Sequence, residues 1–191
     1  MKIARFINKK SVVEIVNRTF LFFFIFIGII ILFFNISRTL AWVTAFGSFL
    51  ASLGLEWVLK HRGVNNRYLI LINISLLLGL LGELVFYYNG YLYYDKILHF
   101  FVGLMITLIV YEYYSKSLKI KKDMIFFTAL GMLTIWEIYE YILMSFFGFP
   151  LMGVITNSIV VQSPFDDTMM DLIWGSIGAI IALLIKENGS S

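Results

Sequence analysis

Residues 20–34 read FLFFFIFIGIIILFF, an unbroken apolar run without a charged or polar side chain. With its flanking residues the run reaches about the 20 residues that a helix needs to cross a hydrocarbon core of about 30 Å. The apolar core is at the long limit for a signal peptide, and no small-x-small cleavage motif follows it. We therefore interpret the segment as a membrane anchor that stays in the protein.

Five further apolar runs of similar length follow this anchor. The chain is 60% hydrophobic and 14% charged, with a mean hydropathy of +0.88, whereas soluble domains carry about a quarter charged residues. The sequence predicts an all-α integral membrane protein, a six-transmembrane-helix bundle forming a single domain over residues 1–188. Residues 189–191 (Gly-Ser-Ser) are interpreted as a cloning remnant. The expected spans are 19–36, 40–59, 68–88, 96–114, 124–147 and 169–185.

Positive charge is distributed unevenly between the expected loops. Of the 15 basic residues, only Arg38 and Lys96 fall in the loops that would share the second side of the membrane. The positive-inside rule then places both termini in the cytoplasm. The expected location is the cytoplasmic (inner) membrane. The net charge of +3 reflects this loop bias, and we find no signature of nucleic-acid binding in it. Membrane lipid is the expected surrounding partner, and the oligomeric state is left open.

The chain has no cysteine, which excludes disulfides, iron–sulfur clusters and thiolate zinc sites. The one long connection on the expected outer side is residues 148–165, GFPLMGVITNSIVVQSPF, and it is unusually apolar for a loop facing water. Non-helical backbone at membrane depth must be buried in protein or line a cavity. We therefore expect a lid or a re-entrant segment between the fifth and sixth spans.

Ionisable residues gather in three short motifs within the expected outer halves of the helices. The motifs are YDKILHF at 94–100, WEIYEY at 136–141 and SPFDDTMMDL at 163–172. Each ionisable group costs roughly 2.5–3.5 kcal/mol at the centre of a membrane helix on insertion scales. Such groups are therefore seldom kept without a use, and three motifs at one depth predict a shared site.

The spacing within the motifs favours a metal site. Asp95 and His99, like Asp167 and Asp171, are four residues apart, and Glu137 and Glu140 are three apart. Residues at these spacings project from one helix face, as paired ligands do in helix-bundle metal centres. Carboxylates with one imidazole suit a divalent ion, with Mg²⁺, Mn²⁺ or iron favoured, as one or two ions. The candidate ligands are Asp95, His99, Glu137, Glu140, Asp167 and Asp171, and the candidate catalytic residues are Glu137, Glu140 and His99.

Structural roles compete with this interpretation at several positions. Asp95, Asp166 and Asp167 could cap helix N-termini, which favour aspartate and negative charge. Glu83, Asp166 and Gln162 could belong to the site or lie outside it. In the inner half, Glu56 precedes Lys60 by four residues, which predicts a helical ion pair.

Four glycines and one histidine are also assigned structural roles. Close helix packing is the expected role of Gly103, Gly131, Gly175 and Gly178. His61 lies in a basic segment and is expected to be solvated.

The three motifs resemble the YjdF-like family of small inner-membrane proteins. Its pattern runs D-[KR]-x-x-H-F-x-x-G, then E-x-x-E before an aromatic residue, then a glutamine-containing loop into W-D-x-x-x-D-M. This chain has DKILHFFVG at 95–103, EIYEY at 137–141, and Gln162 ahead of Asp167 and Asp171. Phe165 or Asp166 stands in place of the family's Trp, and Leu172 in place of its Met. The resemblance covers residues 95–180 and implies that these residues act together. A weaker similarity to VanZ-like proteins rests on the DxxxH start.

The function expected first is a metal-dependent membrane enzyme, a transferase or hydrolase, acting on a lipid-embedded substrate of lipid or isoprenoid type at an outward-facing site. DDTMMD at 166–171 resembles the aspartate-rich stretches of membrane prenyltransferases, but few basic residues are available to bind a phosphate. A di-iron oxidative centre is a further option. The alternative class is a cation- or proton-linked transporter that uses the same acidic cluster. A site that only fixes the helix bundle is the third possibility.

Overall fold

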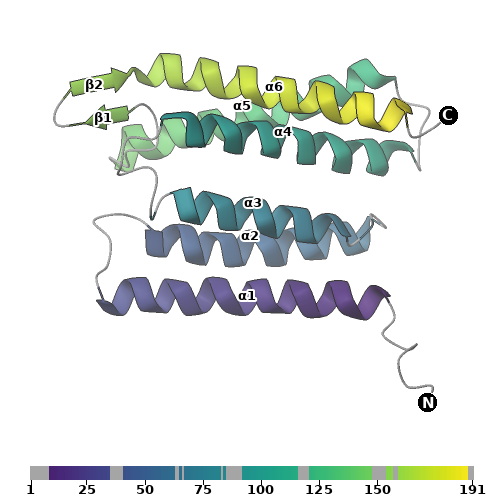
Figure 1. The fold of residues 1–191 in the computed structure, drawn as a ribbon, viewed down its shortest axis with the longest axis horizontal. Helices are drawn as coiled ribbons and strands as arrows, with labels where there is room; N and C mark the ends of the chain where they lie inside the picture. Colours follow the sequence, from purple (N-terminus) through teal and green to yellow (C-terminus); the bar gives the residue numbers. More distant parts are fainter. Residues whose placement is uncertain are drawn as a thin grey trace. The chain divides into compact units, whose positions relative to one another are not determined.

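The computed structural model describes residues 9–34, 41–62, 65, 67–82, 84, 92–115, 121–147, 154–156 and 159–188. Within these ranges the chain forms six helices and one short hairpin (Figure 1). Contacts between Cα atoms divide it into two compact units, Met1–Leu84 and Val85–Ser191. The elements are α1 (Lys9–Phe34), α2 (Ala41–His61), α3 (Arg67–Leu81), α4 (Leu92–Ser115), α5 (Lys122–Phe147), β1 (Val154–Thr156), β2 (Ile159–Gln162) and α6 (Pro164–Asn188). The single domain expected over 1–188 stays a prediction.

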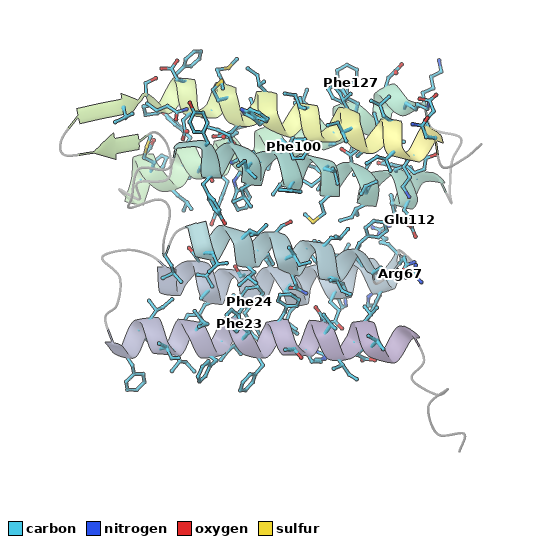
Figure 2. All side chains as sticks on the ribbon, viewed as in Figure 1. Phe23, Phe24, Arg67, Phe100, Glu112 and Phe127 are labelled. Atoms are coloured by element: carbon cyan, nitrogen blue, oxygen red, sulfur yellow. The ribbon has the colours of Figure 1, made fainter. Side chains whose placement is uncertain are left out.

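The first unit packs α1 against α2 and α3 around an apolar core. Phe24, Ile31, Ala45 and Leu80 form this core. Phe24 is fully buried, whereas its neighbour Phe23 is 37% exposed (Figure 2). The alternation follows from the helical period, because only one stripe of α1 can face the other two helices.

A buried polar network also links the three helices of the first unit. The Asn17 side-chain amide donates to Glu56 at 2.7 Å, and the Asn73 amide donates to Asn17 Oδ1 at 2.6 Å. Lys60 Nζ donates to Glu56 Oε1 at 2.6 Å, which confirms the predicted ion pair. Hydrogen bonds between buried side chains are a common means of holding membrane helices together. Asn17 of α1 therefore connects the three helices, because it bonds Glu56 of α2 and Asn73 of α3.

The second unit contains α4, α5 and α6, with α4 and α6 in close contact. A Cβ atom built on Gly103 of α4 would lie 2.0 Å from the carbonyl oxygen of Gly175, and one built on Gly178 of α6 would lie 2.0 Å from that of Phe100. Only glycine permits backbones to approach so closely. The packing role predicted for Gly103, Gly175 and Gly178 is confirmed. It is wrong for Gly131, which is exposed and has no described atom within 4 Å of an added Cβ.

The segment between α5 and α6 contains an antiparallel hairpin. β1 pairs with β2 in the register Ile155 to Val160 and Thr156 to Ile159, with an irregularity after Val154. Figure 1 shows the hairpin leading into the N-terminal end of α6. The described residues 154–156 and 159–162 of this segment are non-helical, and the two short strands are an addition to an otherwise all-helical chain. Its role as a lid or re-entrant segment stays a prediction.

Four of the described helices are long and apolar enough to cross a membrane. They are the ranges Val12–Phe33, Tyr93–Tyr114, Lys122–Phe146 and Pro164–Asn188, and Arg67–Leu81 is a shorter apolar helix. Many large apolar side chains are exposed, including Phe33 at 82%, while charged side chains such as Glu56 and Lys96 are buried. A protein in water favours the opposite distribution, so these surfaces suit a lipid environment. The count of six spans and the orientation stay predictions.

Candidate functional site

The three ionisable motifs meet at one end of the second unit. Asp95 and His99 lie in the first turns of α4, Glu137 and Glu140 near the C-terminal end of α5, and Asp167 and Asp171 in the first turns of α6. α4 and α6 thus bring their N-terminal ends to the site, and α5 runs in the opposite direction. The six candidate ligands predicted from the sequence therefore belong to one constellation. Their roles in metal binding and catalysis stay predictions.

Lys96 lies at the centre of the aspartates. Its side chain is only 5% exposed, and its Nζ donates to Asp171 Oδ1 at 2.8 Å, to Asp95 Oδ2 at 3.2 Å, and to Asp167 Oδ1. Asp167 and Asp171 are as deeply buried as the lysine, whereas the Asp95 side chain is 43% exposed. Buried charges in membrane proteins are normally paired in this way. The contacts tie α4 to α6 directly through two buried ion pairs.

His99 lies between the aspartates and the glutamates. Its Nε2 is 3.6 Å from Asp95 Oδ1 and 3.9 Å from Asp171 Oδ1, and its Nδ1 is 3.5 Å from Glu137 Oε1. The imidazole is 7% exposed. The two ring nitrogens therefore face two different sets of carboxylates, and the ring itself separates the sets.

The glutamate set differs from the aspartate set in its partners. Glu137 is 4% exposed, and its Oε1 is buried without a hydrogen-bond donor among the described residues. Glu140 accepts a hydrogen bond from Trp136 Nε1 at 2.8 Å. Within the described part of the chain, no lysine or arginine forms an ion pair with either glutamate. A buried carboxylate oxygen without a donor costs several kcal/mol unless a cation or proton meets it.

Two groups of side chains have the geometry to hold a metal ion. One is Asp95, His99 and Asp171, and the other is His99, Glu137 and Glu140; in each group one potential ligand atom per residue lies within 4.8 Å of the others. Both groups contain His99. Asp167 belongs to neither group among the described residues, and its carboxylate accepts a hydrogen bond from Lys96.

Three further predicted residues fall outside these groups. Asp166 is exposed, and its backbone N–H and its carboxylate both hydrogen-bond the Ser163 hydroxyl, so it belongs to the cap of α6. Gln162 is half-buried in β2 and makes no hydrogen bond to the described residues of the cluster. Glu83 lies outside the described residues. His61 is exposed, as predicted.

Lys96 is the site residue that the sequence did not reveal. It stands next to Asp95 in DKILHF and was expected in an outer loop or at the helix mouth. A helical stripe gives the missing signal: Lys96, His99, Gly103 and Thr107 follow at intervals of three and four, and all are buried. A lysine on the same face as buried small residues is oriented toward a neighbouring helix rather than toward water.

The fold and the cluster together define a helical membrane protein with ionisable side chains buried between its helices. Some of them form ion pairs, and Glu137 does not form one with a lysine or arginine of the described residues. A family model described as "Predicted membrane protein (DUF2238)" matches residues 17–187. The chain belongs to this family. Membership agrees with the resemblance to YjdF-like proteins and extends the match toward the N-terminus as far as residue 17, while the similarity to VanZ-like proteins stays a prediction. No curated protein and no solved structure matches the chain.

Proposed function

We propose that the protein is a metal-dependent membrane enzyme that acts on a lipid-embedded substrate. The observation that carries this proposal is the buried Glu137 Oε1, which makes no hydrogen bond within the described part of the chain and lies 3.5 Å from His99 Nδ1. A divalent ion bound there would satisfy this oxygen. Carboxylate and imidazole ligands suit Mn²⁺, Fe²⁺ or Mg²⁺.

The number of ligands supports catalysis over a structural role. Each potential group offers three side chains, and structural zinc sites usually have four ligands whereas catalytic ones keep an open position. A bound metal in an open site supplies a Lewis acid and an activated water. Glu140 is less buried than Glu137. Its carboxylate is therefore the better placed of the two to meet a substrate.

The charges near the site bear on the substrate. Lys96 already donates to three carboxylates, which leaves it unsuited to bind a diphosphate as well. Arg38, the other basic residue expected on this side, lies outside the described residues. We therefore favour a lipid or isoprenoid whose reacting group is uncharged, such as a hydroxyl or an ester. The site would face the extracytoplasmic side of the cytoplasmic membrane, as the basic residues of the sequence predict.

Lipid turnover in reconstituted vesicles tests this proposal. Full-length protein is placed in vesicles of phosphatidylethanolamine, phosphatidylglycerol and a long-chain isoprenoid alcohol, with Mn²⁺ inside and outside, and lipids are analysed by mass spectrometry. We expect a metal-dependent change in one lipid species that falls to the protein-free background in His99→Ala. The matched control is His61→Ala, which changes the exposed histidine of α2 and should retain full turnover.

The same vesicles distinguish the transporter alternative. An entrapped indicator of divalent ions and an entrapped pH dye report uptake while the lipids are analysed. Uptake of ions or protons that depends on His99, without any lipid change, would contradict an enzyme and support a transporter.

A further inference from the structure

We infer that the cluster holds one divalent ion, on the Nδ1 side of His99 with Glu137 and Glu140, and that the Lys96 ammonium permanently occupies the corresponding cation position on the Nε2 side. This inference rests on the proposed metal site and assigns its ligands and its stoichiometry. It also makes His99 the boundary between a metal half and an ion-pair half of one cluster.

The carboxylates on the two sides of the imidazole differ in how their charge is compensated. On the Nε2 side, the two buried carboxylates of Asp167 and Asp171 share the ammonium of Lys96, and Asp95 is 43% exposed to its surroundings. On the Nδ1 side, the buried Glu137 has no donor for Oε1 among the described residues. The buried carboxylate oxygen that a cation or a proton must satisfy therefore lies on the glutamate side.

The proton of the neutral imidazole decides which ring nitrogen can bind a metal. A neutral histidine has one nitrogen that carries a proton and one with a free lone pair, and only the second binds a metal. If Nδ1 binds the ion, the proton is on Nε2, whose nearest carboxylate oxygens are Asp95 Oδ1 at 3.6 Å and Asp171 Oδ1 at 3.9 Å, so a small shift would bring one of them within hydrogen-bond distance. A carboxylate that accepts a hydrogen bond from the second ring nitrogen is the usual arrangement for metal-bound histidine.

The opposite assignment places two cations together. A metal bound to Nε2 and Asp171 would share Asp171 Oδ1 with Lys96 Nζ, which already donates to that oxygen at 2.8 Å. Repulsion between a divalent ion and an ammonium sharing one oxygen is strong in a site with little water. The contacts of Lys96 therefore exclude a second ion from the aspartate side for as long as the lysine is present.

Metal counting on purified full-length protein tests this inference. Wild type and variants are loaded with Mn²⁺ in detergent, desalted and analysed for manganese per chain, and affinities are measured by titration calorimetry. We expect one ion in wild type and a loss of affinity of more than about a hundredfold in Glu137→Gln, which removes a ligand. Asp171→Asn should retain one ion with affinity reduced about 10–100-fold, the effect of changing a neighbour that orients a ligand rather than a ligand itself.

Lys96→Met gives the most specific outcome, because it frees the carboxylates of Asp95, Asp167 and Asp171 for a second ion, which would bind without the protonated Nε2 of His99. We expect two manganese ions per chain in Lys96→Met and one in Lys96→Arg, which keeps the positive charge. Glu187→Gln, an exposed acid paired with Lys122, should bind as wild type does. If Lys96→Met does not fold, the comparison of Glu137→Gln with Asp171→Asn still decides the assignment.

Three outcomes separate this inference from the proposed function. Loss of the ion in Asp171→Asn with retention in Glu137→Gln, or one ion in a folded Lys96→Met, overturns the assignment while leaving a metal enzyme intact. The expected counts without lipid turnover support the assignment and contradict the enzyme. A wild-type protein that binds no Mn²⁺, Fe²⁺ or Mg²⁺ overturns both.

Discussion

Replacing Gly103 with alanine should separate α4 from α6 and disrupt the ionisable cluster. The added Cβ would lie 2.0 Å from the backbone carbonyl oxygen of Gly175, and backbone atoms cannot rotate away as a side chain can. The helices must therefore move apart, and Lys96 of α4 would lose its contacts with Asp171 of α6. We expect a loss of about 3 kcal/mol in the free energy of unfolding, the upper part of the range for overpacked sites. Reversible unfolding in mixed detergent micelles measures it.

A matched glycine on α5 provides the control for this prediction. Gly131→Ala adds the same methyl group where no described atom lies within 4 Å, and alanine favours a helix over glycine by up to about 1 kcal/mol. The control should be neutral or slightly stabilising. If Gly103→Ala unfolds at the same concentration of denaturing detergent as the wild-type protein, the close packing of α4 and α6 is incorrect.

Replacing Lys96 with methionine, in the presence of a chelator, should destabilise the second unit strongly. The substitution leaves the buried carboxylates of Asp167 and Asp171 next to each other without a counter-charge. Removing one partner of a buried ion pair typically costs about 3–5 kcal/mol, because the remaining charge stays buried. The same unfolding measurement should show this loss, and adding Mn²⁺ should restore part of it if the metal replaces the ammonium.

Two further variants show whether the loss comes from buried charge. Lys122→Met breaks the pair with Glu187, whose two side chains are 49% and 56% exposed, so less than about 1 kcal/mol is expected. Adding Asp171→Asn to Lys96→Met should recover stability, since it removes one of the uncompensated charges. Equal losses in Lys96→Met and Lys122→Met would contradict the buried ion cluster.

Much of the site was predictable because its residues follow the helical period. Spacings of three and four residues predicted that each pair of acids shares a helix face, and the alternating direction of successive spans predicted that the three motifs meet. The contacts of Asp171, His99 and Glu137 confirm that meeting. The division of the cluster was not predictable, because the position of the imidazole between two sets of carboxylates depends on how three helices pack.

The buried polar network of the first unit was missed apart from the Glu56–Lys60 ion pair, although a pattern was present. Thr44, Ser48, Ser52, Glu56 and Lys60 recur every four residues along α2. Such a stripe marks the helix face that turns toward other helices rather than toward lipid. Ser52 and Glu56 of this stripe, together with Asn17 of α1, are buried in the polar network. An average of hydropathy along the chain conceals this pattern, because it gives no weight to the direction of each side chain.

X-ray absorption spectroscopy of the Mn²⁺-loaded protein in detergent tests the central claim most directly. The account predicts a bound ion whose spectrum contains scattering from one imidazole together with oxygen ligands. The imidazole signal should persist in Asp171→Asn and disappear in His99→Ala. A spectrum with oxygen neighbours alone, unchanged by His99→Ala, would contradict a metal centre built on His99, Glu137 and Glu140.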